Sequence, residues 1–286
     1  IGVSRQGDPL KSEILKILSG LEGTWAVAFE DLQTGERLLI NEREMFHAAS
    51  TMKTPVMIEV FKRIREGSWR LEDSVLIRNE FRSLVDGSLY AMDLKDDSDN
   101  SMYKRVGTSV SVRELLIQMI TVSSNLAANI LIDRVGADNV TKTMRSLGAD
   151  SILVLRGVED QKAYDLGLNN KTNAYDLLLI LKSIAEHRVV DKGACEEMLE
   201  ILDDQKFRDI IPALLPRGTR VAHKTGSITG IEHDSGIIFL PDGRSYVLVL
   251  LSKEGTDAKR TKAVLAQVSK RVYDHMMAKE NVHRPR

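Results

Sequence analysis

The amino-acid sequence predicts a mixed α/β (α+β) fold, in which one antiparallel five-stranded sheet carries flanking terminal helices and an all-helical domain is inserted. Two observations support this prediction. Segments typical of strands lie near both ends of the chain, whereas the segments between them follow helical spacing. A chain of 286 residues is long enough for one large domain or two modest ones. We therefore expect a sheet domain made of residues 1–55 and 196–286 and an all-helical domain made of residues 56–195.

The beginning of the chain is expected to form a helix, a hairpin and a second helix. The segment DPLKSEILKILSGL (8–21) carries apolar residues at helical spacing. The segment TWAVAFEDLQTGERLLINE (24–42) is typical of two strands around a polar turn that contains Gly35. The segment VMIEVFKRIREG (56–67) indicates a helix that Gly67 closes.

The middle of the chain is polar and irregular from 68 to 110 and then becomes helical. Its stretch 92–105 holds four aspartates, Asp93, Asp96, Asp97 and Asp99. These lack the ordered spacing and closing glutamate of an EF-hand, so we expect a solvated loop rather than a calcium site. Helices are then expected in SVRELLIQMIT (111–121), NLAANILIDRVG (125–136), ADNVTKTMRSLG (137–148), TNAYDLLLILKSIAEH (172–187) and CEEMLEILDDQ (195–205).

The last third of the chain returns to strands. RVAHKTGSI (220–228), SGIIFL (235–240) and SYVLVLLS (245–252) are typical of strands, and the last two are joined by a turn at PDG (241–243). A long helix is expected from 258 to 279. The segment IEHD (231–234) could suggest a metal site, but three adjacent polar residues cannot all point inward from a strand, so we expect a loop there.

Composition excludes several classes of protein. The 40 basic and 41 acidic residues give a net charge of −1, so no broad basic field for nucleic acid is present. No apolar run approaches the roughly 20 residues that span a bilayer. Cys195, the only cysteine, excludes an internal disulfide and is expected to be inert. We expect neither a metal nor another cofactor, and a monomer.

The first motif with chemical meaning lies in FHAASTMKTPVM (46–57), where Ser50 and Lys53 are three positions apart. On a helix these two positions share a face, so the hydroxyl and the amine can converge. A serine hydroxyl is a poor nucleophile until a base takes its proton. A lysine can be that base when burial or nearby positive charge lowers its pKa. A lone S-x-x-K is weak evidence, because it occurs by chance in many chains.

Two further motifs follow along the chain. In ITVSSNLAAN (120–129), Ser124 or Asn125 could simply cap the next helix, or Ser123 could relay a proton while the Asn125 amide orients a bound carbonyl. In VAHKTGSITG (221–230), Lys224 could be an edge-strand residue, or Lys224 and Thr225 could hold a substrate carboxylate.

Gly226, the last residue of this third motif, would let a ligand approach the strand backbone, and the N–H groups after it would line a pocket.

The order and separation of the three motifs resemble those of class A β-lactamases and the related penicillin-binding proteins, whose trio is S-x-x-K, S-D-N and K-T-G. The resemblance covers nearly the whole chain. It includes the helical segment 111–136 around the second motif and the final hairpin 235–252. It implies a sheet domain beside an all-helical domain, with the active site in the cleft between them.

The resemblance implies specific roles in catalysis. Ser50 would attack a β-lactam or peptide-like carbonyl, Lys53 would assist its deprotonation, and Ser123 would pass a proton towards the leaving nitrogen. The backbone N–H groups of Ser50 and Ser227 would hold the oxyanion.

It also implies roles in binding. Asn125 would contact the acylamide side chain of the substrate, and Lys224 and Thr225 would hold its carboxylate beside Gly226.

The chain departs from the family pattern at several positions. The middle motif reads Ser-Ser-Asn, His223 stands before Lys224 where aspartate is usual, and no arginine follows K-T-G at the place where the family binds the substrate carboxylate. We interpret His47, three positions before Ser50, as structural rather than as part of a Ser-His-Asp triad. Tyr90, Tyr103 and Tyr164 could line the cleft.

The largest departure is in the loop that carries the deacylating glutamate of class A enzymes, which read E-x-x-x-N there. In RGVEDQKAYDLGLNN (156–170), Glu159 is the natural candidate for that base, but the position four residues on is Ala163. Asp160 and Asp165 are its rivals, and all three could be solvated loop charges. The loop also looks shorter than usual.

The sequence therefore predicts a class A-type serine β-lactamase, acylated at Ser50 and hydrolysing the β-lactam amide. Two alternatives stay open: a D-Ala-D-Ala peptidase or esterase with slow deacylation, and a non-catalytic β-lactam sensor. The substrate is expected to be a small molecule, a β-lactam or a cell-wall-like peptide. A secreted or periplasmic location fits this chemistry, and it fits a chain that begins with Ile1.

Overall fold

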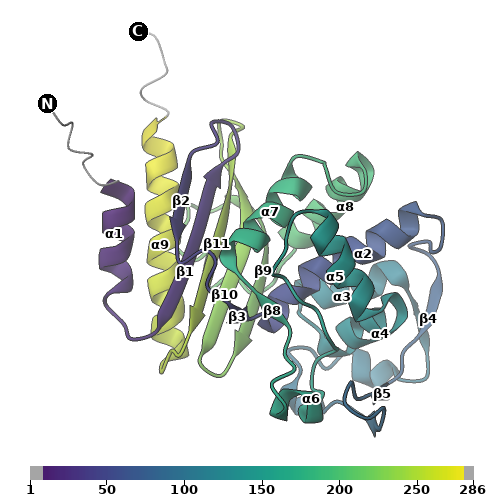
Figure 1. Ribbon diagram of the computed structural model, residues 1–286. Coiled ribbons are helices and arrows are strands. Elements are labelled where there is room, and N and C mark those ends of the chain that lie inside the picture. The colour runs from purple at the N-terminus through teal and green to yellow at the C-terminus, as the bar shows by residue number, and fades with distance from the viewer. Residues whose placement is uncertain (1–8, 280–286) are drawn as a thin grey trace, which may run out of the picture.

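The sheet is assembled from the two ends of the chain in the computed structural model, which describes residues 9–279. Its strand order is β2-β1-β11-β10-β9, and every neighbouring pair is antiparallel. This confirms the predicted α+β fold with an antiparallel five-stranded sheet (Figure 1). The strands are β1 (Thr24–Asp31), β2 (Arg37–Ile40), β9 (Arg220–Ile228), β10 (Ile231–Phe239) and β11 (Ser245–Lys253).

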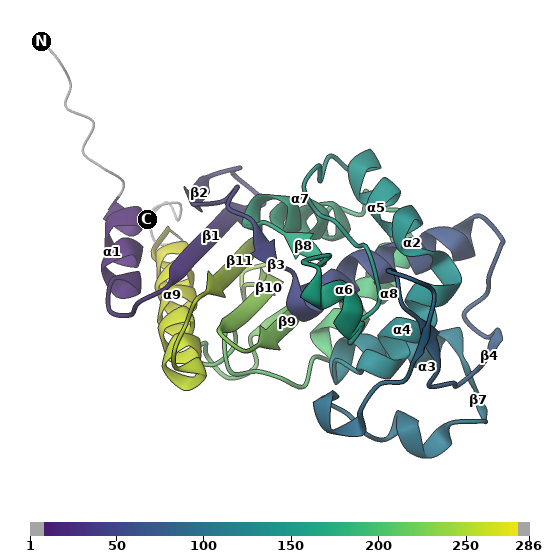
Figure 2. The same ribbon diagram turned by 60° about the horizontal axis from the view of Figure 1, so that its bottom comes forward.

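Helices cover both faces of this sheet. The terminal helices α1 (Pro9–Leu18) and α9 (Ala258–Ala278) pack on each other and cover one face, whereas α7 (Ala174–Ala185) contacts β1, β10 and β11 on the other (Figures 1 and 2). Both faces of the central strands are therefore removed from water, and β11 reads as an unbroken run of buried residues rather than an alternation.

The other long helices form a body beside the sheet (Figure 2). Their apolar faces meet around α2, whose first nine residues are all buried. The predicted domain boundaries at 55/56 and 195/196 stay predictions. The helices of this body are α2 (Lys53–Arg65), α3 (Val112–Thr121), α4 (Asn125–Val135), α5 (Ala137–Ser146) and α8 (Lys192–Asp203).

Short elements connect the two parts. Strand β3 (Phe46–His47) pairs with β8 (Lys171–Thr172), which joins the residues before Ser50 to the end of the loop that carries Glu159. The segment 68–110 is less irregular than expected, because one pair of short strands joins its two ends and a second pair forms a hairpin within it. The elements of this segment are β4 (Ser74–Leu76) with β7 (Ser109–Ser111), β5 (Phe81–Arg82) with β6 (Leu89–Tyr90), and the short helices η2 (Leu94–Asp96) and η3 (Met102–Arg105). The short helix α6 (Gln161–Asp165) lies in the loop that carries Glu159.

The expectation of a loop at IEHD was wrong, because these residues open strand β10. Glu232, His233 and Asp234 are all buried. A strand turns successive side chains to opposite faces, and here helices cover both faces, so polar residues on each side need buried partners rather than water. Glu232 lies near Lys262 of α9, whereas the His233 ring contacts the His47 carbonyl on the other face.

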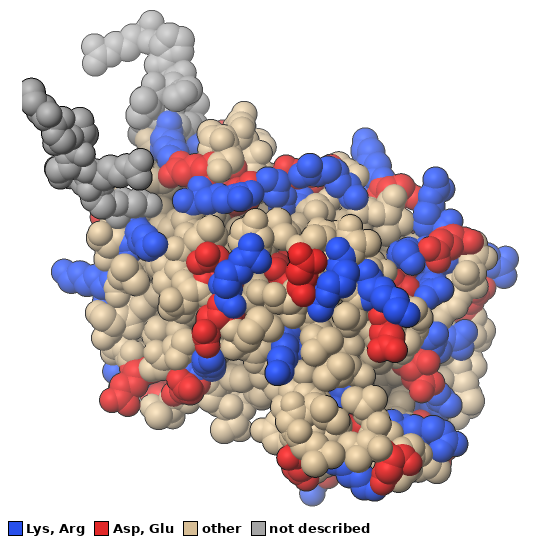
Figure 3. All heavy atoms as spheres, viewed as in Figure 1, with Lys and Arg blue, Asp and Glu red and all other residues tan. Residues whose placement is uncertain are grey.

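The surface and the helix lengths agree with the composition. On the face drawn in Figure 3, Lys and Arg side chains are interspersed with Asp and Glu. Within residues 9–279, no helix is both long and apolar enough to cross a membrane.

Candidate active site

Ser50 lies on a single turn of 3₁₀ helix, η1 (Ala49–Met52), directly before α2. Its side chain is therefore presented just ahead of the helix rather than within it, and Ala49 adopts a left-handed φ of 45° at this turn. Strand β9 approaches the same turn. A Cβ atom added to Gly226 would lie 3.1 Å from the Ser50 nitrogen and 3.2 Å from the Thr51 nitrogen. The K-T-G glycine is thus needed for this close approach of two backbones.

Lys53 is the first residue of α2 and is fully buried. Its Nζ donates to the Ser123 carbonyl oxygen at 2.6 Å, to Ser123 Oγ at 3.1 Å and to Asn125 Oδ1 at 2.8 Å. Burial lowers the pKa of Lys53 to about 7, and the carboxylates of Asp97 and Glu159 oppose this fall. A substantial fraction of Lys53 is then neutral near pH 7 and able to accept a proton.

The Ser123 hydroxyl lies between two buried amines. Lys53 Nζ donates to it at 3.1 Å and Lys224 Nζ donates to it at 3.0 Å. Ser123 itself holds a left-handed φ of 58°, a backbone conformation that is uncommon outside glycine. Burial and the neighbouring Lys53 charge lower the pKa of Lys224 well below its usual value. This arrangement connects the first, second and third motifs through one hydroxyl group.

A cleft of about 230 Å³ opens beside this network. Of the predicted site residues, it is lined by Ser50, Ser123, Thr225, Gly226 and Ser227. Lys53 and Lys224 lie behind the cleft wall and reach it through Ser123.

The far end of the cleft carries charged residues that sequence reasoning missed. Lys262 Nζ lies 2.8 Å from Asp209 Oδ2 and 3.7 Å from Glu232 Oε2, and Ser227 Oγ donates to Glu232 Oε1 at 2.9 Å. Burial raises the pKa of Glu232. The polarity of IEHD was a usable signal for Glu232, whereas only the fold brings α9 and its Lys262 to the cleft.

His223 on β9 and His233 on the neighbouring strand β10 have structural roles. His223 turns away from Lys224, and its Nδ1 lies 2.8 Å from Asp234 Oδ1 in the buried layer beneath α9. His233 Nε2 donates to the His47 carbonyl, while its Nδ1 accepts from the Ser252 N–H. Burial lowers the pKa of His233 to about 4, so it stays neutral near pH 7 and fixes the strand that enters the Ser50 turn.

His47 has a local role. Its Nδ1 accepts a hydrogen bond from the Ala49 N–H at 3.0 Å, and burial lowers its pKa. This contact supports the start of η1, in agreement with the structural interpretation of His47.

Hydrogen bonds join the two ends of the loop 156–170. The Arg156 guanidinium donates to the carbonyl oxygens of Gly157 and Leu168 and to Asn169 Oδ1, each at 2.8–2.9 Å. Asn170 Oδ1 accepts from the Arg156 N–H, and Asn170 Nδ2 donates to the Arg156 carbonyl. These bonds join the two ends of the loop, and its middle is hydrogen-bonded to residues outside it at Val158, Glu159 and Asp160.

Glu159 extends from this loop towards the second motif with a left-handed φ of 62°. Its Oε1 accepts from Asn125 Nδ2 at 3.1 Å, and its Oε2 accepts from the Asp93 N–H at 3.1 Å. Burial raises its pKa. Since Asn125 Oδ1 accepts from Lys53, one amide joins the predicted deacylation base to the predicted acylation base.

The two rivals of Glu159 are placed differently. Asp160 is buried and accepts from the Ala163 N–H, the Ser83 hydroxyl and the Leu84 N–H. Asp165 is exposed and accepts from Gln161.

Asn129, one helical turn after Asn125, is a further residue of the site that the sequence did not reveal. Its Oδ1 accepts from the Val158 N–H at 2.7 Å, and its Nδ2 donates to the Val158 carbonyl at 3.0 Å. A Cβ atom on Gly157 would lie 2.5 Å from Asn129 Oδ1. This clamp fixes the backbone directly before Glu159. Its only signal in the sequence was the i, i+4 spacing from Asn125 on one helix face.

Neither of the two features that suggested a metal, the aspartates of 92–105 and the segment IEHD, forms a metal site. Asp97 turns its carboxylate to backbone N–H groups at the start of α4. Within residues 9–279, no group of three or more His, Cys, Asp or Glu residues is arranged to hold a metal ion.

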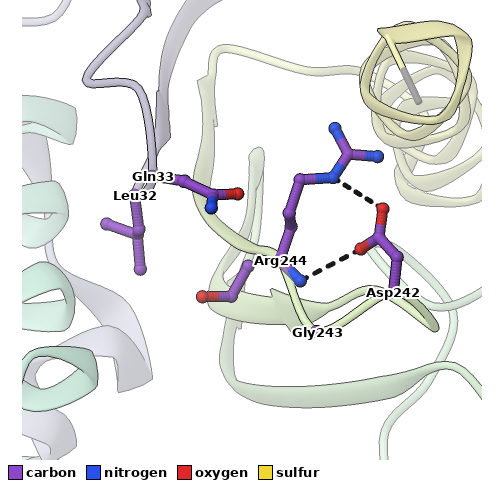
Figure 4. Close-up of a pocket in the computed structure, with 6 residues that line it drawn as sticks. Leu32, Gln33, Asp242, Gly243 and Arg244 are labelled. Carbon is purple, nitrogen blue, oxygen red and sulfur yellow. Dashed lines mark hydrogen bonds and ion pairs between the residues drawn. The ribbon is translucent and has the colours of Figure 1, made fainter. Parts of the chain in front are cut away.

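A second hollow lies at the turn between β10 and β11, near Leu32 and Gln33 (Figure 4). There Arg244 donates to Asp242 from its Nε at 2.6 Å and from its backbone N–H at 3.0 Å. These bonds stabilise the turn, and none of the predicted catalytic residues lines this hollow.

Comparisons with known proteins agree with this geometry. Residues 9–276 match the model of the β-lactamase enzyme family. The chain is 28% identical to the extended-spectrum β-lactamase PER-1 of Pseudomonas aeruginosa, over 96% of this chain and 90% of that protein. It is 24% identical to a β-lactamase of Bacteroides uniformis, over 96% and 93%.

Among solved structures, PBP-A superposes with a TM-score of 0.81 and 26% identity, covering 97% of this chain and 99% of that one. The TLA-1 extended-spectrum β-lactamase superposes with a TM-score of 0.80 and 24% identity, over 93% and 98%, which shows the common fold.

The chain therefore belongs to the β-lactamase enzyme family. It is an enzyme of the class A serine β-lactamase type, a hydrolase that acts on a cyclic amide.

Proposed function

We propose that β-lactams acylate Ser50 and that the enzyme then hydrolyses the acyl group, so that the β-lactam amide is opened. The observation that carries this proposal is the buried network of Lys53, Ser123 and Lys224 that ends beside Ser50 in the cleft. It supplies a base with a pKa near 7 and a hydroxyl that can carry a proton to the leaving nitrogen.

The acylation step follows from this arrangement. Lys53 takes the proton of the Ser50 hydroxyl as the oxygen attacks the β-lactam carbonyl carbon. The backbone N–H groups of Ser50 and Ser227 stabilise the oxyanion. As the C–N bond breaks, Ser123 gives its proton to the β-lactam nitrogen and recovers one from Lys53, which returns to its neutral form.

Substrate binding uses the residues around this centre. Thr225 lines the cleft, and Lys224 lies behind Ser123, where its amine can donate to the substrate carboxylate. The Asn125 amide meets the acylamide side chain of the substrate.

Deacylation requires a base for water, and we assign this role to Glu159. Its raised pKa suits a general base, and its carboxylate is one hydrogen bond from Asn125. Both of its oxygens already accept hydrogen bonds, and it does not line the cleft with Ser50. Release of the acyl group is therefore the slower half of the cycle.

A chromogenic cephalosporin tests this proposal. We expect repeated turnover by the wild-type enzyme and none above background by Ser50→Ala. A single stoichiometric burst without turnover would contradict the hydrolase assignment.

One observation favours a second candidate, a D-Ala-D-Ala peptidase or esterase with slow deacylation. The engaged carboxylate of Glu159 disfavours rapid attack by water, and the fold is also that of PBP-A, a variant of which was solved as an acyl-enzyme complex with penicillin G. Release of D-alanine from a peptide ending in D-Ala-D-Ala would support this candidate, and its absence beside rapid β-lactam turnover would exclude it.

A further inference from the structure

Asp97 brings a carboxylate from the segment after η2 to the start of α4. Both of its oxygens lie 2.9 Å from the Asn125 nitrogen, and Oδ2 also accepts from the Leu126 N–H at 3.0 Å. The Tyr103 hydroxyl donates to the same Oδ2 at 3.0 Å. These N–H groups belong to the first turn of a helix, where no partner exists within the helix itself.

This carboxylate completes a cap that the sequence divides between two segments. The hydroxyl of Ser124, the residue before α4, accepts from the Ala127 N–H at 3.3 Å. The first two N–H groups of the helix are left to Asp97, 28 residues earlier in the chain. A negative charge at a helix N-terminus is also favourable to the helix dipole.

Asp97 thereby holds Asn125, the residue that connects the catalytic groups. The backbone N–H of Asn125 donates to Asp97 and its Nδ2 donates to Glu159, whereas its Oδ1 accepts from Lys53. Any shift of the first turn of α4 would move all of these contacts together.

We propose that Asp97 is a positioning residue for acylation, whose carboxylate holds Asn125 in the geometry that receives both Lys53 and the substrate. This inference rests on the proposed acylation of Ser50. Asp97 acts through Asn125 and has no direct contact with the nucleophile in this account.

The charge of Asp97 adds a second effect on Lys53. The charged groups that face Lys53 are Asp97 and Glu159, which favour its protonated form, and Lys224, which opposes it. Removing the Asp97 charge therefore lowers the pKa of Lys53 further, and the neutral base persists to lower pH. A loss of packing alone does not produce this shift.

The test is the pH dependence of acylation by benzylpenicillin, measured on wild-type enzyme, Asp97→Asn and Asp99→Asn. Asp97→Asn is expected to slow acylation by about 10-fold or more, because charged hydrogen bonds to two N–H groups are weakened, and to move the acidic limb to lower pH. Asp99→Asn removes the same charge two residues away, where the carboxylate accepts from Ser101, and is expected to stay within about 2-fold without a shift.

A second, more conservative variant tests the inference if Asp97→Asn fails to fold. Tyr103→Phe removes one hydrogen bond to Asp97 and keeps the charge, so it is expected to slow acylation by about 2- to 3-fold without moving the limb. If Asp97→Asn leaves rate and limb unchanged, or slows acylation with the limb unmoved, the inference is overturned. If the wild-type enzyme is not acylated at all, the proposed function fails first, which is a distinguishable result.

Discussion

The acylation centre and the loop that carries Glu159 are held in different ways. On the acylation side, Lys53, Ser123 and Lys224 come from α2, the α3–α4 turn and β9, and all three are buried. Their hydrogen bonds join residues 70 and 101 positions apart in the chain. On the deacylation side, hydrogen bonds of Arg156 and Asn170 join the two ends of the loop across 14 residues or fewer, and Leu166 there is 63% exposed.

Each half of the reaction therefore depends on a different part of the structure. The acylation geometry is fixed by the packing of the fold, because three separate elements must be in place for the Ser123 hydroxyl to meet both amines. The deacylation geometry depends on one loop, which hydrogen bonds at Val158, Glu159 and Asp160 join to the rest of the protein. The asymmetry predicts variants that damage one half of the cycle and spare the other.

The largest effect is expected on the acylation side, from Lys53→Gln. Acylation should fall by about 10³-fold, since a positioned general base contributes on the order of 10²–10⁴ to the rate. In the wild-type enzyme the acylation rate should rise as the pH rises through about 7, because the lowered pKa makes Lys53 a neutral base above that value.

Single-turnover mixing with benzylpenicillin measures both. The matched control is Lys62→Gln, on the same helix, where the side chain is 39% exposed and pairs with Glu66. A comparable loss in both variants would show that the Lys53 network has no special role.

The next effect is expected from Glu159→Gln, which should slow deacylation by about 10²-fold and leave acylation within about 3-fold. The carboxamide can still accept from Asn125, but it cannot take a proton from water. Asp165→Asn is the control, since it removes an exposed charge from the same loop. Unchanged deacylation in Glu159→Gln would remove this residue from the mechanism and favour the peptidase-like alternative.

The smallest effect is expected from Asn129→Ala, which removes both hydrogen bonds to the Val158 backbone. Deacylation should fall by about 10-fold as the loop before Glu159 loosens, and the Val158 N–H and carbonyl lose a buried partner, at a stability cost of about 1–3 kcal/mol. Urea unfolding and the decay of the acyl-enzyme measure the two losses. Equal losses in acylation and deacylation would break the proposed separation of the two sides.

Much of the fold and of the acylation centre could be predicted from the sequence. The sheet strands carry long apolar runs, and Ser50, Lys53, Ser123 and Lys224 belong to motifs with fixed internal spacing. Asp97 could not be found in this way, because its partner lies 28 residues away and its own surroundings are typical of a solvated loop.

The errors have a physical cause as well. The expectation of a loop at IEHD depends on a strand having one face in water, whereas helices cover both faces of β10. The role of Asn129 could not be predicted, because it bonds to the backbone of Val158 and residue types do not reveal where a loop backbone lies.

We expect Ser50 to be acylated rapidly by the buried Lys53 network and to be released slowly by the loop that carries Glu159. Intact-protein mass spectrometry during reaction with benzylpenicillin tests it most directly, with Ser50→Ala as the control. In the wild-type enzyme we expect one adduct per molecule to form rapidly and to decay slowly as hydrolysed penicillin accumulates. We expect no adduct in Ser50→Ala. Penicillin hydrolysis that proceeds equally in Ser50→Ala, or an adduct on another residue, would contradict it.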